Sequence, residues 1–308
     1  MKRKPYRYLL YLGLRLLQTV VLCLPRPVAL ALARMVGRLA FWVTRREREK
    51  TLAHLANAFV EEKTSPEILK LAKGVFVHYA QVAVDVLRFP RLTLEEIDRL
   101  VQWDDQLGIF DEALSKGKGV ILLTAHLGNW EMMGAFFCLH GYPGVVVARR
   151  IYYEKFNEVL LKMRSKTPLK TIYQDASPRE YLKALHQNQI LGILADQDVD
   201  RMDGIFVPFF GHPAYTLTSP VRLALATGAP LIPAFMVREG DHYRLLVEQP
   251  IYVDMGINKE ETIRRYTERW SQIVEAKVRE FPDQWIWMHP RWRTAMQSVR
   301  TAQMVAHD

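Results

Sequence analysis

Cysteine is scarce in this chain: Cys23 and Cys138 are the only two among 308 residues, and they lie far apart in apolar surroundings. No Cys-x-x-Cys pair and no cluster of cysteine with histidine is present. Disulfide frameworks and structural zinc sites need several such residues at short spacings, so the sequence excludes both. Internal repeats and low-complexity linkers are also absent from the sequence, which argues against a repeat architecture.

Acidic residues are nearly missing from the N-terminal segment. The first 50 residues hold twelve Lys and Arg against two acidic residues, whereas the other 258 hold 30 basic and 31 acidic residues. A nucleic-acid-binding body would carry Lys and Arg among stacking aromatic residues throughout its length. The net charge of +9 therefore belongs to the N-terminal segment, and nucleic acid is not an expected partner.

This basic segment contains two apolar runs, residues 6–24 and 28–43. A signal peptide would need small residues at a cleavage site after the first run, and they are missing. Arg15 interrupts a run that is barely long enough to span a bilayer. We therefore expect residues 1–44 to form membrane-associating helices that lie in or dip into a membrane surface, held by membrane lipids and by the basic flanks. The alternative is a buried helix pair with a solvated arginine stripe.

The rest of the chain alternates short apolar runs with helical stretches. This alternation predicts an α/β fold with a mixed, largely parallel central sheet flanked by helices, as one domain over residues 45–308. The expected strands are residues 120–124, 145–148, 190–195, 230–237 and 243–248, and the expected helices include residues 68–87, 129–139, 153–166, 178–188, 219–227 and 260–280.

The most informative segment is VILLTAHLGNWE, residues 120–131, in which an apolar strand ends at His126. Active sites of open α/β sheets gather beyond the carboxyl ends of strands. His126 and Glu131 can meet only if the chain turns between them, for which Gly128 is suited, and Asn129 would cap the next helix. A carboxylate bound to one imidazole nitrogen leaves the other nitrogen as a base. Because no Ser or Cys nucleophile accompanies the pair, it would activate a substrate hydroxyl.

A metal site is not predicted around His126. His78, His140 and His186 offer no second ligand at a zinc-like spacing from His126 and Glu131. The sequence therefore favours acid–base chemistry at this pair over metal chemistry.

Other segments belong to a known pattern. The strand ILGILADQD ends in Asp196-Gln197-Asp198, VPFFG covers residues 207–211, and WIWMHPRW covers residues 285–292. Together with HLGNWE, the order and spacing of these segments resemble the bacterial lipid A biosynthesis late acyltransferases. These lauroyl and myristoyl acyltransferases form a branch of the lysophospholipid acyltransferase superfamily, and the resemblance extends over nearly the whole chain.

The resemblance implies a glycerolipid acyltransferase-like fold at the cytoplasmic face of the inner membrane. It implies transfer of a fatty acyl group from an acyl carrier protein thioester to a hydroxyl of a lipid A precursor. The phosphopantetheine thioester arrives as the donor substrate, so no bound cofactor and no metal are expected. His126 is then the general base and Glu131 its partner. The candidate substrate-binding residues are Asn129, Arg149, Arg164, Asp196 and Asp198, with Arg164 the best match to the family's functional arginine and Arg149 and Arg150 as alternatives.

The chemistry that the resemblance implies has three requirements. The enzyme must deprotonate the hydroxyl, hold both chains, and stabilise the oxyanion that forms on the thioester carbonyl. Backbone N–H groups in residues 128–130, at a helix start, are candidates for the last task. An acidic acyl carrier protein would also find a complementary surface in the basic N-terminal region.

Several functions stay open on the sequence alone. One alternative is an acyltransferase with another glycolipid acceptor, such as a mannosylated phosphatidylinositol, or with an acyl-CoA donor. Another is a membrane adaptor that keeps the fold without catalysis, although the presence of His126 and Glu131 speaks against it.

Overall fold

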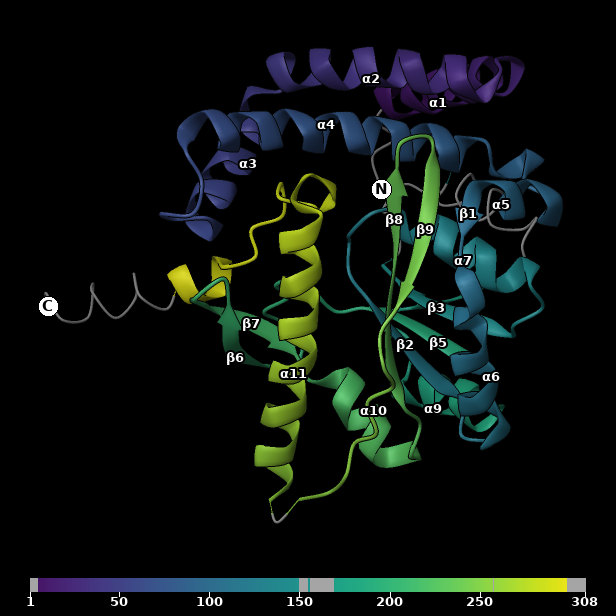
Figure 1. Ribbon diagram of the computed structural model, residues 1–308, viewed down its shortest axis with the longest axis vertical. Coiled ribbons are helices and arrows are strands. Elements are labelled where there is room, and N and C mark those ends of the chain that lie inside the picture. The colour runs from purple at the N-terminus through teal and green to yellow at the C-terminus, as the bar shows by residue number, and fades with distance from the viewer. Residues whose placement is uncertain (1–4, 150–154, 156–168, 257, 298–308) are drawn as a thin grey trace, which may run out of the picture.

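The computed structural model describes residues 5–149, 155, 169–256 and 258–297, and it shows a central sheet with helices on both faces (Figure 1). The described strands of this sheet lie in the order β1-β9-β8-β2-β5-β3-β4, and β6 and β7 form a separate hairpin. The strands are β1 (Val101–Gln102), β2 (Val120–Thr124), β3 (Gly144–Ala148), β4 (Lys170–Tyr173), β5 (Ile190–Leu194), β6 (Gly204–Phe209), β7 (His212–Leu217), β8 (Leu231–Glu239) and β9 (His242–Val247).

The sheet is mixed and mostly parallel, as the alternating pattern predicted. Only the pair β8–β9 is antiparallel within it, among the described strands. Parallel strands that are covered on both faces are apolar throughout, and β2 is buried at every position. All five expected strands are present. The sequence analysis did not identify β1, β4, β6 and β7, because β1 and β4 are short and the hairpin is interrupted by prolines.

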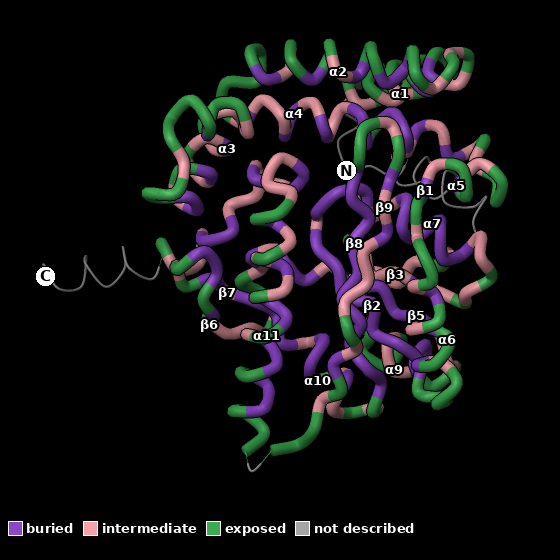
Figure 2. The backbone as a smooth tube through the Cα atoms, viewed as in Figure 1, coloured by how far each residue is buried: buried purple, intermediate pink, exposed green. Residues whose placement is uncertain are grey.

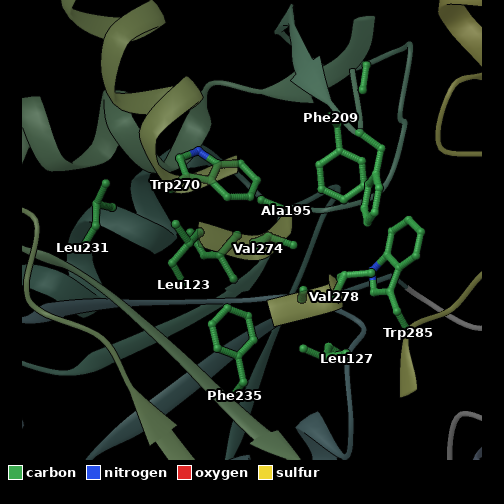
Figure 3. Packing of buried hydrophobic residues seen from close by; sticks show 14 of the residues in the cluster. Leu123, Leu127, Ala195, Phe209, Leu231, Phe235, Trp270, Val274, Val278 and Trp285 are labelled. Carbon is green, nitrogen blue, oxygen red and sulfur yellow. The ribbon is translucent and has the colours of Figure 1, made fainter. Parts of the chain in front are cut away.

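Alternate residues of β2 face opposite layers of helices. Leu122 packs with α6 (Leu107–Ser115) and α7 (Trp130–Leu139), whereas Leu123 packs with α10 (Ser219–Thr227) and α11 (Lys259–Glu280). Figure 3 shows the second of these layers, in which Trp270 and Val274 of α11 lie near Leu123. The sheet is therefore the middle of three layers. Other helices of the described residues are α3 (Arg45–Ala58), α5 (Leu94–Leu100), α9 (Pro178–His186) and the short 3-10 turns η1 (Phe89–Arg91), η2 (Asp104–Gln106) and η3 (Pro282–Gln284).

The N-terminal segment forms two helices, α1 (Pro5–Cys23) and α2 (Arg26–Val43), which lie along α4 (Ser65–Leu87) at the top of Figure 1. At the crossing of α2 and α4, a Cβ on Gly37 would lie 2.6 Å from the Cα of Val77, so only glycine allows this close approach. The outer surface of both helices is exposed (Figure 2), and many of its side chains are apolar, which a buried helix pair with a solvated arginine stripe does not account for. The exposed side chains are Leu9, Leu10, Leu12, Leu16, Leu17 and Val20 on α1, and Val28, Leu32, Met35, Val36, Leu39, Trp42 and Val43 on α2.

Membrane insertion of these helices is a separate question. Among the residues that the structure describes, no single helix combines the length and the apolar composition needed to cross a membrane. Helices α2 and α3 meet that requirement only as a pair, and they are bent by 90°. The structure thus leaves the membrane anchor a prediction.

Candidate active site

The site forms where two neighbouring parallel strands end at the same edge of the sheet. Strands β2 and β5 pair in register, with Thr124 opposite Leu194. His126 and Asp196 each lie two residues beyond these positions, so the register places them side by side. This is the usual location of active sites in open α/β sheets.

The side chain of Asp196 binds His126 at two points. Its Oδ1 lies 2.8 Å from Nδ1 of the imidazole, and its Oδ2 accepts from the backbone N–H of His126 at 2.9 Å. Oδ2 also accepts from the indole Nε1–H of Trp285 at 2.8 Å. The carboxylate therefore fixes both the backbone and the ring of His126.

Asp196 is ionised despite its complete burial. Burial alone would raise the pKa of this carboxyl, but the charge of His126 and the hydrogen bonds that His126 and Trp285 donate outweigh it and lower the pKa to about 2. An ionised carboxylate only accepts hydrogen bonds, so Nδ1 of His126 carries the proton. The other ring nitrogen, Nε2, is then unprotonated in the neutral imidazole and is able to take a proton.

A second set of contacts, from two residues of α4, holds the backbone carbonyl groups of His126 and Gly128. Tyr79 on α4 donates its hydroxyl to the carbonyl oxygen of His126 at 2.8 Å. Nε2 of His78 lies 3.1 Å from the carbonyl oxygen of Gly128, and burial lowers the pKa of His78 to about 3, which keeps it neutral as the donor of that bond. The ring of Trp130 stands edge-on to the ring of His126, with centroids 4.9 Å apart.

The turn that follows His126 depends on Gly128. Its φ is +65°, and a Cβ at this position would lie 2.0 Å from the carbonyl oxygen of Met236. A side chain is therefore excluded by both conformation and space. The backbone N–H of Gly128 donates to Gln284, and that of Asn129 donates to Met236. Three backbone N–H groups were predicted to stabilise the oxyanion, and these two already donate to backbone carbonyl oxygens. The N–H of Trp130 is the candidate that remains.

Asn129, a predicted substrate-binding residue, is not among the residues that line the pocket of His126. Its side chain is completely buried, with Oδ1 accepting from the N–H of Met132 and Nδ2 donating to the hydroxyl of Tyr243. The same contacts confirm that Asn129 is the N-cap of α7. Its role is thus to start the helix that follows the turn.

Glu131 lies in the first turn of α7 and lines the same pocket as His126. The carboxylate that fixes Nδ1 of His126 is Asp196, a role that the sequence analysis gave to Glu131. The sequence contained a signal for Asp196. His126 and Asp196 each lie two positions beyond a strand of five apolar or small residues, 120–124 and 190–194.

A pocket of about 500 Å³ opens in front of His126. Its mouth is polar and carries Arg149, Arg201, Arg293 and His289, of which the sequence analysis had named only Arg149. Burial lowers the pKa of His289 to about 4, so this histidine is neutral, and its Nε2 accepts from the N–H of Asp198. Arg164 lies outside the described residues, as does its alternative Arg150.

Asp198 borders this pocket but is committed to the fold. Its carboxylate accepts from the N–H and the hydroxyl of Thr294, at 2.8 and 2.6 Å, and pairs with Arg293. Its contacts fasten the segment after His289 to the end of β5.

The inner end of the pocket is an apolar slot between the sheet and α7. Leu122, Gly192 and Val146 lie side by side in register on β2, β5 and β3 and form its floor. Met133 and Gly134 of α7 form the opposite wall. The slot is open because Gly192 lacks a side chain: a Cβ there would lie 3.2 Å from Cγ1 of Val146.

Comparison with known proteins gives one family and two kinds of relative. The family model described as "Bacterial lipid A biosynthesis acyltransferase" matches residues 2–294. The lipid A biosynthesis lauroyltransferase of Escherichia coli (strain K12) is 24% identical over 304 residues, which cover 96% of this chain and 94% of that protein. The lipid A biosynthesis myristoyltransferase of the same strain is 23% identical over 290 residues, 93% of this chain and 87% of that protein. A phosphatidylinositol mannoside acyltransferase of Mycobacterium tuberculosis (strain H37Rv) is 26% identical over 234 residues, 73% and 71% of the two chains.

The contacts of Asp196 predict a pH-dependent loss of stability in the variant Asp196→Asn. The lowered pKa of about 2 means that the ionised carboxylate stabilises the fold above its unfolded pKa near 3.8, and that this stabilisation disappears as the pH falls towards 2. We expect Asp196→Asn to lower the free energy of unfolding by about 2 kcal/mol at pH 7 and by progressively less below pH 4.

Urea denaturation of both proteins at a series of pH values measures this difference. The exposed Asp175→Asn is the matched control and should change the free energy of unfolding by less than about 0.5 kcal/mol. A difference for Asp196→Asn that is small at pH 7, or that grows in acid, would show that Asp196 is not an ionised acceptor.

Proposed function

Because the chain belongs to the bacterial lipid A biosynthesis acyltransferase family, we propose that it transfers a fatty acyl group from an acyl carrier protein thioester to a hydroxyl of a lipid A precursor. The observation that carries this proposal is the fixed imidazole of His126, held at Nδ1 by Asp196 at the polar end of a pocket whose inner end is apolar.

His126 acts as the general base in this proposal. Nε2 takes the proton from the acceptor hydroxyl while the hydroxyl oxygen bonds to the thioester carbonyl carbon. The carbon–sulfur bond then breaks, and the imidazolium returns the proton to the leaving thiolate. Asp196 stabilises the imidazolium through Nδ1 without taking its proton, because the low pKa of Asp196 keeps the proton on the ring.

Glu131 and the N–H of Trp130 serve the substrate side of the reaction. Both belong to the first turn of α7, and Glu131 and the side chain of Trp130 line the pocket in front of His126. We assign Glu131 to the pocket side of the imidazole and of the hydroxyl, where its carboxylate orients the proton that is transferred. The positive end of the α7 dipole stabilises the oxyanion.

The two ends of the pocket fit the two parts of an acyl thioester. The slot of Leu122, Val146 and Gly192 takes the hydrocarbon chain, since burial of each methylene contributes about 0.8 kcal/mol. The arginines at the mouth, Arg149 and Arg201, match the phosphate of phosphopantetheine and the phosphates of a glycolipid acceptor. No bound cofactor takes part in this scheme.

Helices α1 and α2 hold the enzyme to the cytoplasmic face of the inner membrane in this proposal. Their exposed surface is apolar over most of its length, with Leu16 at 68% and Leu39 at 61% exposure. Basic residues flank it, among them Arg38 and Arg46, which suits an anionic lipid surface. Both lipid substrates reach the pocket from that surface.

A second acceptor has an observation in its favour. The relative from Mycobacterium tuberculosis is named for the acylation of a phosphatidylinositol mannoside, and its identity to this chain is similar to that of the lipid A enzymes. Both acceptors offer a hydroxyl on a phosphorylated glycolipid, so the same base and pocket serve either. A non-catalytic adaptor is disfavoured, because an adaptor has no use for an ionised carboxylate that fixes one tautomer of a pocket histidine.

His126→Ala should lower acyl transfer by about 10²- to 10⁴-fold, the usual contribution of a general base, while leaving the fold intact. The assay incubates detergent-purified protein with acyl carrier protein thioesters, or with acyl-CoA, and a panel of lipid A precursor and phosphatidylinositol mannoside. Mass spectrometry then reads the gain of one acyl chain on each lipid.

Gain on the lipid A precursor, absent in His126→Ala, is the expected result. Gain on the mannoside alone would keep the chemistry and replace the acceptor. Folded protein that acylates no lipid with either donor, or a fully active His126→Ala, would contradict the proposal.

Gly192→Val should shift the preferred donor to shorter acyl chains. Its Cβ and methyl groups would project into the slot beside Val146, and valine adds three carbon atoms, so we expect a loss of about one to three methylenes from the preferred chain. Competition among thioesters of different length measures the preference. Gly108→Val is the matched control, because a Cβ at the exposed Gly108 meets no atom within 4 Å. An unchanged preference in Gly192→Val would place the acyl chain elsewhere.

A further inference from the structure

A second, smaller cavity of about 200 Å³ lies at the turn between α1 and α2. It has no lining residue in common with the pocket of His126. Its walls come from the start of α2, the end of α4, the turn η1, the helix α5 and one residue of α7. The lining residues are Arg26, Asp85, Arg88, Arg91, Leu92, Glu96, Arg99, Leu100 and Met132.

The charged residues of this lining are four arginines and two acids. One of the acids, Asp85, is already shared by two guanidinium groups. Arg26 binds it through Nε and Nη2, at 2.8 and 3.2 Å, and Arg238 binds it from the side of the sheet. Asp85 is 1% and Arg238 is 5% exposed, so this network leaves a buried positive charge in excess.

Among the described residues, Arg88 and Arg91 form no ion pair within 4 Å, although the charges of Glu96 and Asp85 act on Arg88 from farther away. Nη1 of Arg88 donates to the carbonyl oxygens of Val21 and Leu24, both at 2.8 Å, and so caps the end of α1. Burial first, and then the charge of Arg91, lower the pKa of Arg88. Repulsion between like charges at a cavity is relieved when an anion enters it.

The acidic groups around the cavity do not cancel this excess. Arg99 pairs with Glu95 on the surface of α5, and Asp241, beyond Arg26, accepts from Arg34. Glu96 remains as the second acid in the lining. The cavity and its surroundings therefore hold more positive than negative side chains, so an anion is the complementary ligand. The six arginines are Arg26, Arg34, Arg88, Arg91, Arg99 and Arg238, and the four acids are Asp85, Glu95, Glu96 and Asp241.

The surroundings identify the class of anion. Arg88 ties the cavity to the end of α1, and the last turns of α1 expose the side chains of Leu17 and Val20, at 51% and 47%. A cluster of arginines beside an exposed apolar helix is complementary to a molecule with a phosphate next to hydrocarbon chains. A small inorganic anion would satisfy the arginines alone and would leave this apolar surface uncovered.

We propose that this cavity binds the phosphate of an anionic glycerophospholipid, with its acyl chains along the exposed surface of α1, at a site separate from the catalytic pocket. The bound lipid fixes the depth and orientation of the α1–α2 pair at the bilayer. The proposal requires only that α1 meets lipid, and it stands or falls independently of which acyl acceptor the enzyme uses.

The test is calorimetric titration of the full chain, in a non-ionic detergent, with short-chain phosphatidylglycerol below its micellar concentration. A neutral detergent removes the general attraction of a charged membrane, so binding reports the site itself. We expect saturable binding that Arg91→Gln weakens about tenfold, the loss of one charge-assisted hydrogen bond. The control Arg179→Gln makes the same charge change at an exposed residue of α9 and should weaken binding by less than about twofold.

Several outcomes would overturn the proposal. Equal weakening by Arg179→Gln would indicate a general charge effect, and loss of binding in Arg201→Gln but not in Arg91→Gln would place the lipid in the catalytic pocket. Inorganic phosphate that binds as tightly as the lipid would make free phosphate the ligand. An acyl carrier protein that loses affinity for Arg91→Gln, while the lipid does not, would make the cavity a protein-docking site. If Arg91→Gln fails to fold, Arg88→Lys is the second variant. It keeps the charge at the end of α1, and weaker lipid binding in this variant would support the proposal.

Discussion

The pairing of β2 with β5 is the constraint on which the rest of the site depends. Because Thr124 and Leu194 are opposite each other, two extra residues on each strand place His126 against Asp196. The carboxylate then needs donors to remain ionised in a buried position, and the backbone of His126 and the indole of Trp285 supply them. A slip of β2 by one residue against β5 would turn the side chain of His126 to the opposite face from Asp196 and remove the site.

At the same edge of the sheet, residues from several elements hold His126 in place. Tyr79 comes from α4, Trp285 from the C-terminal segment, and Gly128 turns the chain into α7 with no room for a side chain. These residues are far apart in the sequence, which explains why the family pattern extends over nearly the whole chain. The proposed chemistry depends on the ends of two strands, whereas the geometry of the site depends on most of the structure.

Much of the fold could be predicted from the sequence, because buried parallel strands are apolar throughout. The segment at residues 120–124 is such a run, and the predicted bounds match β2. The site could be predicted only in part: His126 follows from its position after a strand, but its carboxylate at Nδ1 did not. Spacing along the chain favoured Glu131, whereas the contact with Asp196 arises from strand register, which no local pattern specifies. Asn129 was named for two roles, and its burial allows only that of the N-cap.

The chain has two separate cavities with arginines in their linings, and we propose that each binds a different anionic group. Arg149 and Arg201 line the pocket of His126, where we propose that they bind substrate phosphates, whereas Arg26, Arg88 and Arg91 line the cavity beside the exposed surface of α1. If both proposals hold, one lipid orients the enzyme while the others react. The basic residues of the N-terminal segment then attract anionic lipid in two ways, by their net charge and by the cavity that Arg26 helps to form.

The central claim is that Asp196 holds His126 in the tautomer whose Nε2 is free to take a proton. Nitrogen-15 NMR of histidine-labelled protein at neutral pH tests it directly, with His126→Gln to assign the resonances. The account predicts a protonated Nδ1 and an unprotonated Nε2 for His126, and a loss of that preference in Asp196→Asn. A proton on Nε2 in the wild-type protein, or a tautomer that does not change in Asp196→Asn, would contradict it.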